Sequence, residues 1–497
     1  WSWSAPERGR SARDSPPRTR AEAKGRAALA ATQPRSRFAR ALVATVAALA
    51  LVGGAGAAVS LSQGPRVSGV QVDVDAVSAV ANQRLIITAN EPLAAIDAAQ
   101  VSIEPETPIS VDASGRAVGV QFALPLRSAT EYTVTIADVQ SVAGGPASTL
   151  VVSFTAAEQA IFVLQRGGSK GDGSTDTIFT ANVEGDVALP VFTHGHIEDY
   201  RATRDALLVS VVDDEVAGLL RVNLDGSSPQ PFAVPGNGSI DTLQASDSAG
   251  LVGYTYTDAS IGRPGALESA LFVSRIAEPD AAPIPITVDG AAVPVASWRF
   301  VPGTTSVLLV TFGGELLRVD TANPDAAAVA LGFAMQVDGV WPGSTRAAVA
   351  RVGDDVVIDL GNASETPLFA PADATKLGRP GILVPFAGGG YLRTFTTFDD
   401  ATGVADNAVV RVDGDGHTTE LFRLDTELGA IMQVCGSPSG EFVAVLVAPN
   451  LVNNPFDSAR LSLPKRLQTH IIDAQSGDER TAIAGFGINW CETAAWS

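Results

Sequence analysis

The sequence has little of the material from which most metal sites and catalytic sites are built. It contains only two cysteines and four histidines in 497 residues, which excludes a four-thiolate zinc site and a disulfide-dense mini-protein. Positive charge is also scarce, because 34 Lys and Arg stand against 54 Asp and Glu, a net charge of −20. That balance argues against a nucleic-acid-binding protein. Hydrophobic residues make up 46% of the chain, which excludes a wholly disordered protein.

The charge is unevenly distributed along the chain. Residues 1–40 carry a net charge of +7, residues 67–497 carry −28, and residues 41–62 (ALVATVAALALVGGAGAAVSLS) carry none. A helix of that length spans about 33 Å, which is enough to cross a hydrocarbon core of about 30 Å. Arg35, Arg37 and Arg40 precede the apolar segment, and positive flanks stay in the cytoplasm.

These features predict a single-pass protein of the cell membrane. Residues 1–40 are a disordered basic cytoplasmic tail, residues 41–62 form an N-terminal transmembrane helix acting as a signal anchor, and the bulk of the chain is extracytoplasmic. A cleaved signal peptide, which would make the protein secreted, is the alternative for the apolar segment. A buried core helix is a further alternative.

Residues 67–157 show the alternation of apolar and polar residues that is typical of half-buried strands. Val70, Val72 and Val74 form the first such run, and Tyr132, Val134 and Ile136 form a later one. Turn sequences rich in Gly, Pro, Asn and Ser separate the runs. About seven short strands in this length predict a β-sandwich.

This region resembles the bacterial Ig-like domains of surface-layer and wall-associated proteins. The resemblance rests on residues 85–93 (LIITANEPL), 126–136 (LRSATEYTVTI) and 153–155 (SFT). It implies a spacer or adhesive module without catalysis. The hydroxyl group of Tyr132 is expected to bond to nearby backbone, which is a structural role.

Residues 160–497 are built from a repeated block of strands, turns and hairpins. Successive blocks start at Ile197, Ile240, Val295, Val337, Gly381 and Ile431. Their spacing of about 42–57 residues suits one four-stranded blade of a β-propeller. The predicted fold class is therefore all-β, with an Ig-like β-sandwich followed by a β-propeller.

The two ends of the repeat region complement each other. Residues 161–167 (IFVLQRG) and 177–192 (TIFTANVEGDVALPVF) supply the later strands of a blade, and residues 487–491 (GINWC) look like a first strand without its blade. Together they make one complete blade, which leaves no open sheet edge. This pairing predicts seven blades, with six or eight as alternatives.

The same closure brings the two cysteines together. Cys435 and Cys491 occupy equivalent places in two first strands, and ring closure makes those strands neighbours. We predict a disulfide between them, since an exported protein permits such a bond. Two buried thiols are the alternative.

The repeats resemble the propellers of WD-repeat-like and TolB-type periplasmic proteins. That family carries a W-S-P-D-G turn in its first hairpin, and residues 437–440 (SPSG) are the nearest copy here, with fragments at 341–343 (WPG) and 301–303 (VPG). The resemblance implies the propeller architecture without naming a partner.

Few side chains stand out as carrying chemistry. Trp298, Trp341 and Trp490 lie near first strands, where they could stack on a sugar or peptide ligand or pack between blades. His194 and His196 could hold a metal, and two Asp-Gly stretches (172–176 and 413–416) echo calcium loops, although each is explained by an ordinary turn or connection. The sequence indicates no catalytic residues, no resident metal and no cofactor.

The functional expectation is a membrane-anchored extracytoplasmic binding or scaffold protein of the bacterial cell envelope. Its propeller would present a face to an envelope protein, a peptide or a cell-wall glycan. One alternative is a propeller-type hydrolase or lyase that uses carboxylates at the central channel. Another is a sensor subunit that passes an outside signal to the basic tail.

Overall fold

The structure is a computed structural model that describes residues 42, 45–47, 64–167, 174–185, 188–323, 326–398, 405–424 and 428–495. The predicted tail at 1–40 and most of the predicted span at 41–62 lie outside these residues. Among the described residues, no helix is both long enough and apolar enough to cross a membrane. Residues 63–497 form one compact unit that is almost entirely β.

Two antiparallel sheets enclose one hydrophobic core between residues 67 and 155. The four-stranded sheet has the order β1-β2-β5-β4 and the three-stranded sheet has the order β3-β6-β7. The strands are β1 Val67–Gln71, β2 Arg84–Ala89, β3 Val101–Glu104, β4 Ile109–Ser114, β5 Ala117–Phe122, β6 Glu131–Val139 and β7 Ser148–Thr155, with a 3₁₀ turn η1 at Ala98–Gln100. Alternate residues such as Leu85, Ile87, Val134 and Ile136 are fully buried between the sheets. This is a β-sandwich with seven strands; its relation to the Ig-like family stays a prediction.

The predicted strand through Val74 is wrong. Strand β1 stops at Gln71, and Val74–Ala79 forms a short helix, α2. Asp73 caps this helix, because its side chain accepts a hydrogen bond from the Ala76 N–H at 3.0 Å. A carboxylate at the N-cap satisfies a backbone donor that a strand would have bonded elsewhere, and this local interaction overrides the apolar alternation.

Tyr132 has the structural role expected from the sequence. Its ring is buried, and its hydroxyl oxygen accepts a hydrogen bond from the backbone N–H of Arg127 at 3.0 Å. The hydroxyl therefore satisfies a donor in the chain just before β6.

Seven further sheets follow one another between residues 161 and 484, six with four strands and one with three. Their strands are β8 Ile161–Gln165, β9 Asp176–Ala181, β10 Leu189–His194; β11 Ile197–Ala202, β12 Ala206–Asp213, β13 Val216–Asn223, β14 Gln230–Pro231; β15 Gly238–Ser246, β16 Leu251–Asp258, β17 Ala270–Arg275, β18 Ile284–Pro285; β21 Val295–Phe300, β22 Ser306–Thr311, β23 Glu315–Asp320, β24 Val329–Phe333; β25 Gln336–Val340, β26 Arg346–Ala350, β27 Asp355–Asp359, β28 Ser364–Pro367; β29 Arg379–Pro385, β30 Tyr391–Phe398, β31 Ala405–Val412, β32 Thr418–Arg423; and β33 Ala430–Gly436, β34 Phe442–Ala448, β35 Gln468–Asp473, β36 Glu479–Ala484. A small extra hairpin (β19 Thr287–Val288, β20 Ala291–Ala292) and a short helix (α3 Ala374–Leu377) lie in connections.

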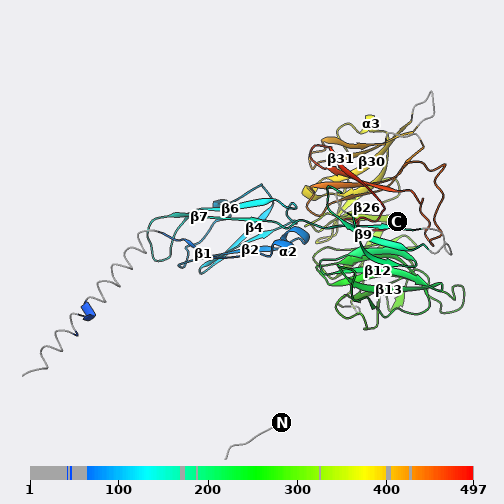
Figure 1. The fold of residues 1–497 in the computed structure, drawn as a ribbon, viewed down its shortest axis with the longest axis horizontal. Coiled ribbons are helices and arrows are strands. Elements are labelled where there is room, and N and C mark those ends of the chain that lie inside the picture. The colour runs from blue at the N-terminus through cyan, green and yellow to red at the C-terminus, as the bar shows by residue number, and fades with distance from the viewer. Residues whose placement is uncertain are drawn as a thin grey trace, which may run out of the picture. The chain divides into compact units, whose positions relative to one another are not determined.

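The sheets are the blades of a β-propeller. The first strands of successive four-stranded sheets contact one another in the order β11, β15, β21, β25, β29 and β33, so they line the inside of a ring. Those strands begin at the predicted block starts or within two residues of them. In Figure 1 the green strands β12 and β13 lie on one side of the ring, the yellow-to-red strands β30 and β31 on the other, and β9 between them.

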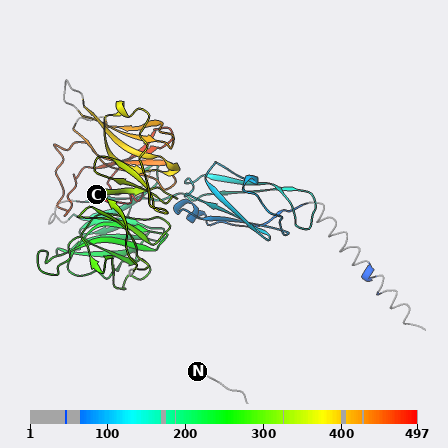
Figure 2. The ribbon, with the colours of Figure 1, turned by 180° about the vertical axis from the view of Figure 1, so that it is seen from behind.

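The ring closes between its two chain ends. Leu164 in β8 forms an antiparallel bridge with Phe486, through two backbone hydrogen bonds of 2.8 and 2.9 Å. Asn489 extends the contact, because its side-chain oxygen accepts from the Phe162 N–H at 2.9 Å. The closing segment, residues 486–491, thus supplies the missing first strand of the β8–β10 sheet. The C-terminal end lies near β9 in Figure 1, and between the green and the yellow-to-orange blades in Figure 2. Seven blades result, one of them built from both ends of the repeat region.

Candidate functional site

The propeller has two faces that differ in the connections they carry. Because the strands of each blade are antiparallel, the hairpins between first and second strands, such as 203–205 and 301–305, emerge on one face, here named the hairpin face. The third-to-fourth-strand turns emerge there too. The second-to-third-strand connections, such as 312–314, emerge on the opposite face with the links between blades, such as 334–335. That opposite face is named the loop face.

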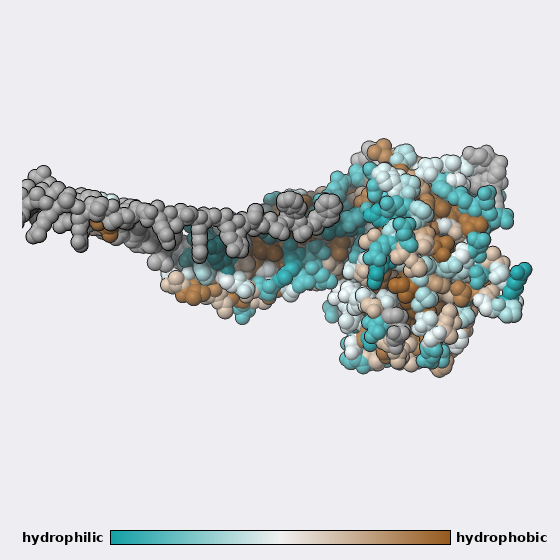
Figure 3. Space-filling model, turned by 90° about the horizontal axis from the view of Figure 1, so that it is seen from below, coloured by the Kyte–Doolittle hydropathy of each residue, from teal (hydrophilic) through white to brown (hydrophobic). Residues whose placement is uncertain are grey.

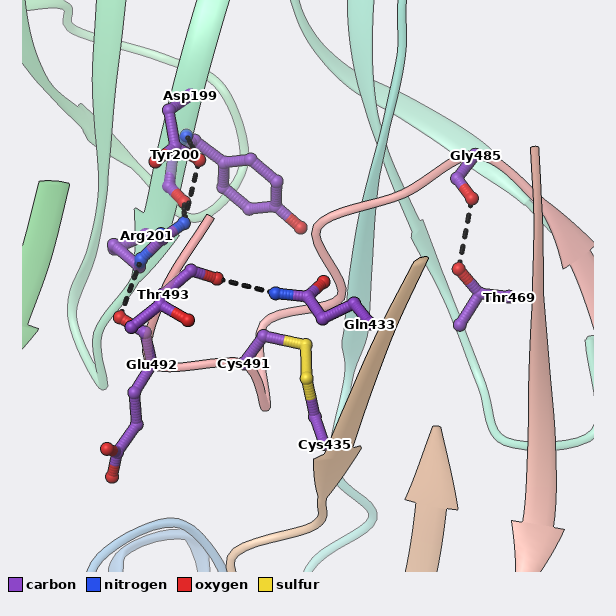
Figure 4. Close-up of a disulfide and its surroundings, with 10 residues drawn as sticks. All are labelled: Asp199, Tyr200, Arg201, Gln433, Cys435, Thr469, Gly485, Cys491, Glu492 and Thr493. Carbon is purple, nitrogen blue, oxygen red and sulfur yellow. Dashed lines mark hydrogen bonds and ion pairs between the residues drawn. A yellow bond between two sulfur atoms is a disulfide. The ribbon is translucent and has the colours of Figure 1, made fainter. Parts of the chain in front are cut away.

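Cys435 and Cys491 form the predicted disulfide, with their Cα atoms 5.2 Å apart. Cys435 lies in β33 and Cys491 is the last residue of the closing segment, so the bond ties the last blade to the first (Figure 4). Nearby, the Gln433 side chain donates to the Thr493 backbone oxygen at 2.8 Å. The Trp490 ring stacks on Phe442 with the ring centroids 6.1 Å apart. The seam is therefore held by a covalent bond, a hydrogen bond and apolar packing.

Charged side chains from the inner strands gather beside this seam. Arg201 on β11 donates to Asp199 Oδ1 at 2.8 Å, and its Nε donates to the backbone oxygen of Glu492 at 3.3 Å (Figure 4). Both side chains of this pair are more than nine-tenths buried. Burial raises the pKa of Asp199, while the guanidinium of Arg201 opposes that shift.

Three more charges belong to the same group. Burial raises the pKa of Asp338 on β25 to about 6, with Asp355 adding to the shift and Arg299 opposing it. Desolvation by the surrounding protein atoms raises the pKa of the Glu492 carboxyl group, and the positive charges of Arg299 and Arg201 partly offset this shift. Glu492 nevertheless remains exposed to solvent. We name Asp199, Arg201, Arg299, Asp338 and Glu492 the axial charge cluster.

The axial charge cluster and its surroundings contain polar atoms without partners. Among the described residues, Asp199 Oδ2, Arg201 Nη2, Asp338 Oδ2 and the nearby Arg393 Nε are buried and make no hydrogen bond. Arg299 donates a hydrogen bond to the backbone oxygen of Trp298 at 2.7 Å. Burial lowers the pKa of Arg299, and the negative charges of Glu492 and Asp338 oppose this shift. Unpaired buried polar groups are costly for stability and tend to gather where function requires them.

Sequence reasoning missed the axial charge cluster. A usable signal was present, because Asp199, Arg201, Arg299 and Asp338 are charged residues inside predicted first strands. First strands line the inside of a propeller, so a charged residue at such a position points toward the ring interior or a neighbouring blade.

The three tryptophans singled out from the sequence are not brought together, and all are buried. Trp298 donates its indole N–H to Thr242 Oγ1 at 2.9 Å, and Trp341 donates to the backbone oxygen of Gly390 at 2.6 Å. Trp490 packs at the seam. None of the three has a ring face open to a ligand, so the idea that they stack on sugars or peptides is corrected: they pack between blades.

The histidines and Asp-Gly turns form ordinary local structure. His196 Nε2 lies 2.7 Å from Glu198 Oε1, a hydrogen bond that raises the pKa of His196. In the described part of the chain, Asp413, Asp415 and His417 are the side chains whose donor atoms lie close enough to hold a cation. The carboxylate of Asp413 already accepts from the backbone N–H groups of Asp415 and His417 at 3.0 and 2.9 Å, as in a turn. The first two residues of the other Asp-Gly stretch (172–176), Asp172 and Gly173, lie outside the described residues.

A buried ionic network lies at the loop face of the seam. Arg166 donates to Asp457 Oδ2 at 2.8 Å and to the backbone oxygen of Glu198 at 2.6 Å. Burial alone would raise the pKa of Glu198, but the hydrogen bonds from His196 and from the Arg460 N–H lower it. The network joins the residue after β8, the strand β11 and the long connection 449–467 between β34 and β35.

Comparisons with known proteins assign the chain to no family. No protein-family model matches the chain, and no curated protein matches it. Solved structures that resemble it include a putative TolB from Agrobacterium tumefaciens, with 14% identity and a TM-score of 0.32 over 67% of this chain and 92% of that chain. An auxiliary nutrient binding protein from Bacteroides thetaiotaomicron has 10% identity and a TM-score of 0.32, over 85% and 98% of the two chains. An oligogalacturonate lyase from Vibrio parahaemolyticus has 12% identity and a TM-score of 0.42, over 63% and 92%. At these values the likeness says nothing of function, and the propeller assignment rests on the sheet topology.

Proposed function

We propose that the chain is an extracytoplasmic binding or scaffold protein of the bacterial cell envelope. In this proposal residues 41–62 anchor it to the membrane, the sandwich serves as an Ig-like spacer, and the loop face of the propeller docks a protein or peptide partner. The disulfide supports the compartment, because such bonds persist in oxidising environments and are rare in the cytosol.

The observation that carries the binding function is an uneven distribution of exposed apolar side chains. Phe312, Phe333, Met335 and Val352 are 67%, 69%, 63% and 90% exposed, and they lie on the loop face of two adjacent blades. Other exposed apolar side chains of this face are Ile261, Phe398, Leu451, Val452 and Phe456. Figure 3 shows apolar residues among hydrophilic ones on one side of the molecule.

The hairpin face lacks this enrichment. Its short first-to-second-strand hairpins, 203–205, 247–250, 301–305, 341–345, 386–390 and 437–441, contain no large apolar side chain that is exposed. Leu189 and Val329, at third-to-fourth-strand turns, are the exceptions on that side of the described propeller. Apolar surface that gathers on one face of an acidic protein is typical of a docking surface.

Capture with matched variants tests the docking surface. The full-length protein and its Phe333→Ser/Val352→Ser variant would be used as baits in envelope extract of the source bacterium, with captured proteins quantified by mass spectrometry. The control is Leu189→Ser/Val329→Ser, which makes the same chemical change on the hairpin face. We expect a partner that is lost with the loop-face variant and retained with the control. Capture that is indifferent to the loop-face variant contradicts the proposal.

The compartment is tested separately. In cells of the source bacterium, alkylation of the intact protein before and after reduction should show that Cys435 and Cys491 are oxidised. Two free thiols in freshly quenched cells would contradict an extracytoplasmic location.

A second candidate function is a hydrolase or lyase acting at the axial charge cluster. Three carboxyl groups and two guanidinium groups meet inside the ring, and Asp338 has a pKa of about 6, in the range that suits a general acid or base. Arg299 is placed to stabilise developing negative charge. Turnover of a candidate substrate that is lost in Asp338→Asn but kept in Phe333→Ser/Val352→Ser would favour catalysis over docking.

A further inference from the structure

The loop face contains a cleft at the seam where the ring closes. It has a volume of about 350 Å³, and it lies between the end of β8, the connection 484–486 before the closing segment, and the long connection 449–467. Pockets that take small ligands or single side chains begin at about 300 Å³. The size therefore fits one large side chain or a chain terminus.

The walls of the cleft are held by buried interactions. Arg166 and Asp457 line it, and their side chains are only 4% and 5% exposed in the ion pair between them. The guanidinium of Arg166 also lies over the Phe486 ring, 5.0 Å from its centroid. Asn454 fixes the opposite wall, because it donates to the backbone oxygen of Arg466 at 2.7 Å and accepts from its N–H at 2.9 Å. The cleft is therefore preformed, which lowers the entropic cost of binding.

The cleft is positively charged in a strongly acidic part of the chain. Arg166, Lys465 and Arg466 line it with one carboxylate, Asp457, which is already paired with Arg166. Residues 67–497 contain 23 Lys and Arg against 51 Asp and Glu, so a cationic cleft is unusual on this surface. Lysine and arginine at the mouth of a pocket favour a carboxylate or another anion.

The remaining lining is apolar. Phe486, Leu467, Pro449 and Pro464 contribute to the cleft, and exposed Leu451, Val452 and Phe456 follow on the same connection. A free inorganic anion would use only the cations, whereas a peptide with an acidic residue beside apolar residues would use both kinds of surface.

We infer that this cleft binds an acidic side chain of a peptide segment whose neighbouring residues are apolar. The inference rests on the proposed docking function of the loop face and specifies its partner. The carboxylate lies against Lys465 and Arg466, and the flanking apolar side chains lie against Phe486 and the exposed residues of the 449–467 connection.

Selection from a random peptide library tests the inference. The immobilised full-length protein would be used to select displayed dodecapeptides, and selected peptides would be synthesised for fluorescence anisotropy. We expect enriched sequences to place Asp or Glu next to aromatic or aliphatic residues. Lys465→Gln/Arg466→Gln should weaken their binding by about tenfold, the loss expected from one charged hydrogen bond. The control Arg263→Gln/Lys376→Gln removes the same charge from exposed positions elsewhere on the loop face and should leave binding unchanged.

The outcomes separate this inference from the proposed function. Peptides that lack acidic residues, or that bind Lys465→Gln/Arg466→Gln as well as the wild type, overturn the cleft as an acidic-peptide site. If those peptides still lose affinity in Phe333→Ser/Val352→Ser, the docking function of the face survives alone. A further outcome would also overturn the inference, in favour of a simple anion site. In that outcome inorganic phosphate binds the cleft, but no selected peptide binds Lys465→Gln/Arg466→Gln more weakly than the wild type. If the selected peptides bind both variants as well as the wild type, both the docking function of the loop face and the acidic-peptide site in the cleft are contradicted.

Discussion

Removal of the Cys435–Cys491 disulfide should open the propeller at its seam. The bond joins positions 56 residues apart, and the chain-entropy relation gives about 4 kcal/mol for a closed loop of that size. Backbone hydrogen bonds across the seam are few in the described residues: Leu164 pairs with Phe486, and the Asn489 N–H donates to Phe162. Because few backbone hydrogen bonds hold the closing segment, we expect Cys435→Ala/Cys491→Ala to lower the free energy of unfolding by about 3–4 kcal/mol.

Urea unfolding of the full-length protein, followed by tryptophan fluorescence, measures this loss. Hydrogen exchange then locates it, because the amides of Leu164 and Phe486 should exchange faster in the variant while those of β22 in the middle of the ring should not. A reductant should reproduce the effect in the wild type and change nothing in the variant. The free energy of unfolding could instead fall by less than about 1 kcal/mol, as for an ordinary surface substitution. That result, with unchanged hydrogen exchange at Leu164, would refute the claim that the seam depends on the disulfide.

Three further predictions concern packing, ionisation and the loop-face network. Gly253→Ala should destabilise the propeller by about 1–3 kcal/mol, because a Cβ there would lie 2.5 Å from the Trp298 ring, whereas Gly218→Ala, in ordinary contact, should change the urea midpoint little. Asp338 has a raised pKa of about 6, so its contribution to stability is present below its unfolded pKa and is lost as pH rises through about 6; Asp338→Asn should flatten that part of the stability profile, and an unchanged profile would contradict the assignment. Asp457→Asn removes the shorter of two carboxylate contacts to the buried Arg166 guanidinium, with Glu198 Oε2 remaining at 3.7 Å, and should cost about 2 kcal/mol, with faster proteolysis in the 449–467 connection as the readout.

The blade boundaries could be predicted from the sequence because each first strand has a local signature. Ile197 and Val295 begin apolar alternations that follow a polar connection, and the structure starts β11 and β21 at those residues. The closing segment was also predictable, since residues 161–192 lack a first strand and residues 487–491 lack a blade. The helix α2 was not predictable from alternation, because the Asp73 cap acts over a single turn.

The candidate site was far less visible in the sequence than the fold. Asp199 and Glu492 are almost 300 residues apart in the chain, yet both belong to the axial charge cluster through contacts with Arg201. No local sequence pattern indicates that these residues lie close together, because their proximity depends on ring closure and on the orientation of each blade. The tryptophans failed as site markers for a related reason, because a large ring near a first strand fills the gap between blades as readily as it faces a ligand.

The connections on the two faces differ in length, which supports the proposal that a partner docks on the loop face. The first-to-second-strand hairpins are uniformly short, from 203–205 to 437–441, so they leave little freedom for side chains to diverge. The second-to-third-strand connections range from the tight turn 214–215 to the long connection 449–467. Connections that vary in length can change without disturbing the blades, which is why binding residues concentrate on them. Phe312 and Val352 lie on these variable connections, as does one wall of the cationic cleft, whereas Phe333 and Met335 lie at the link between two blades.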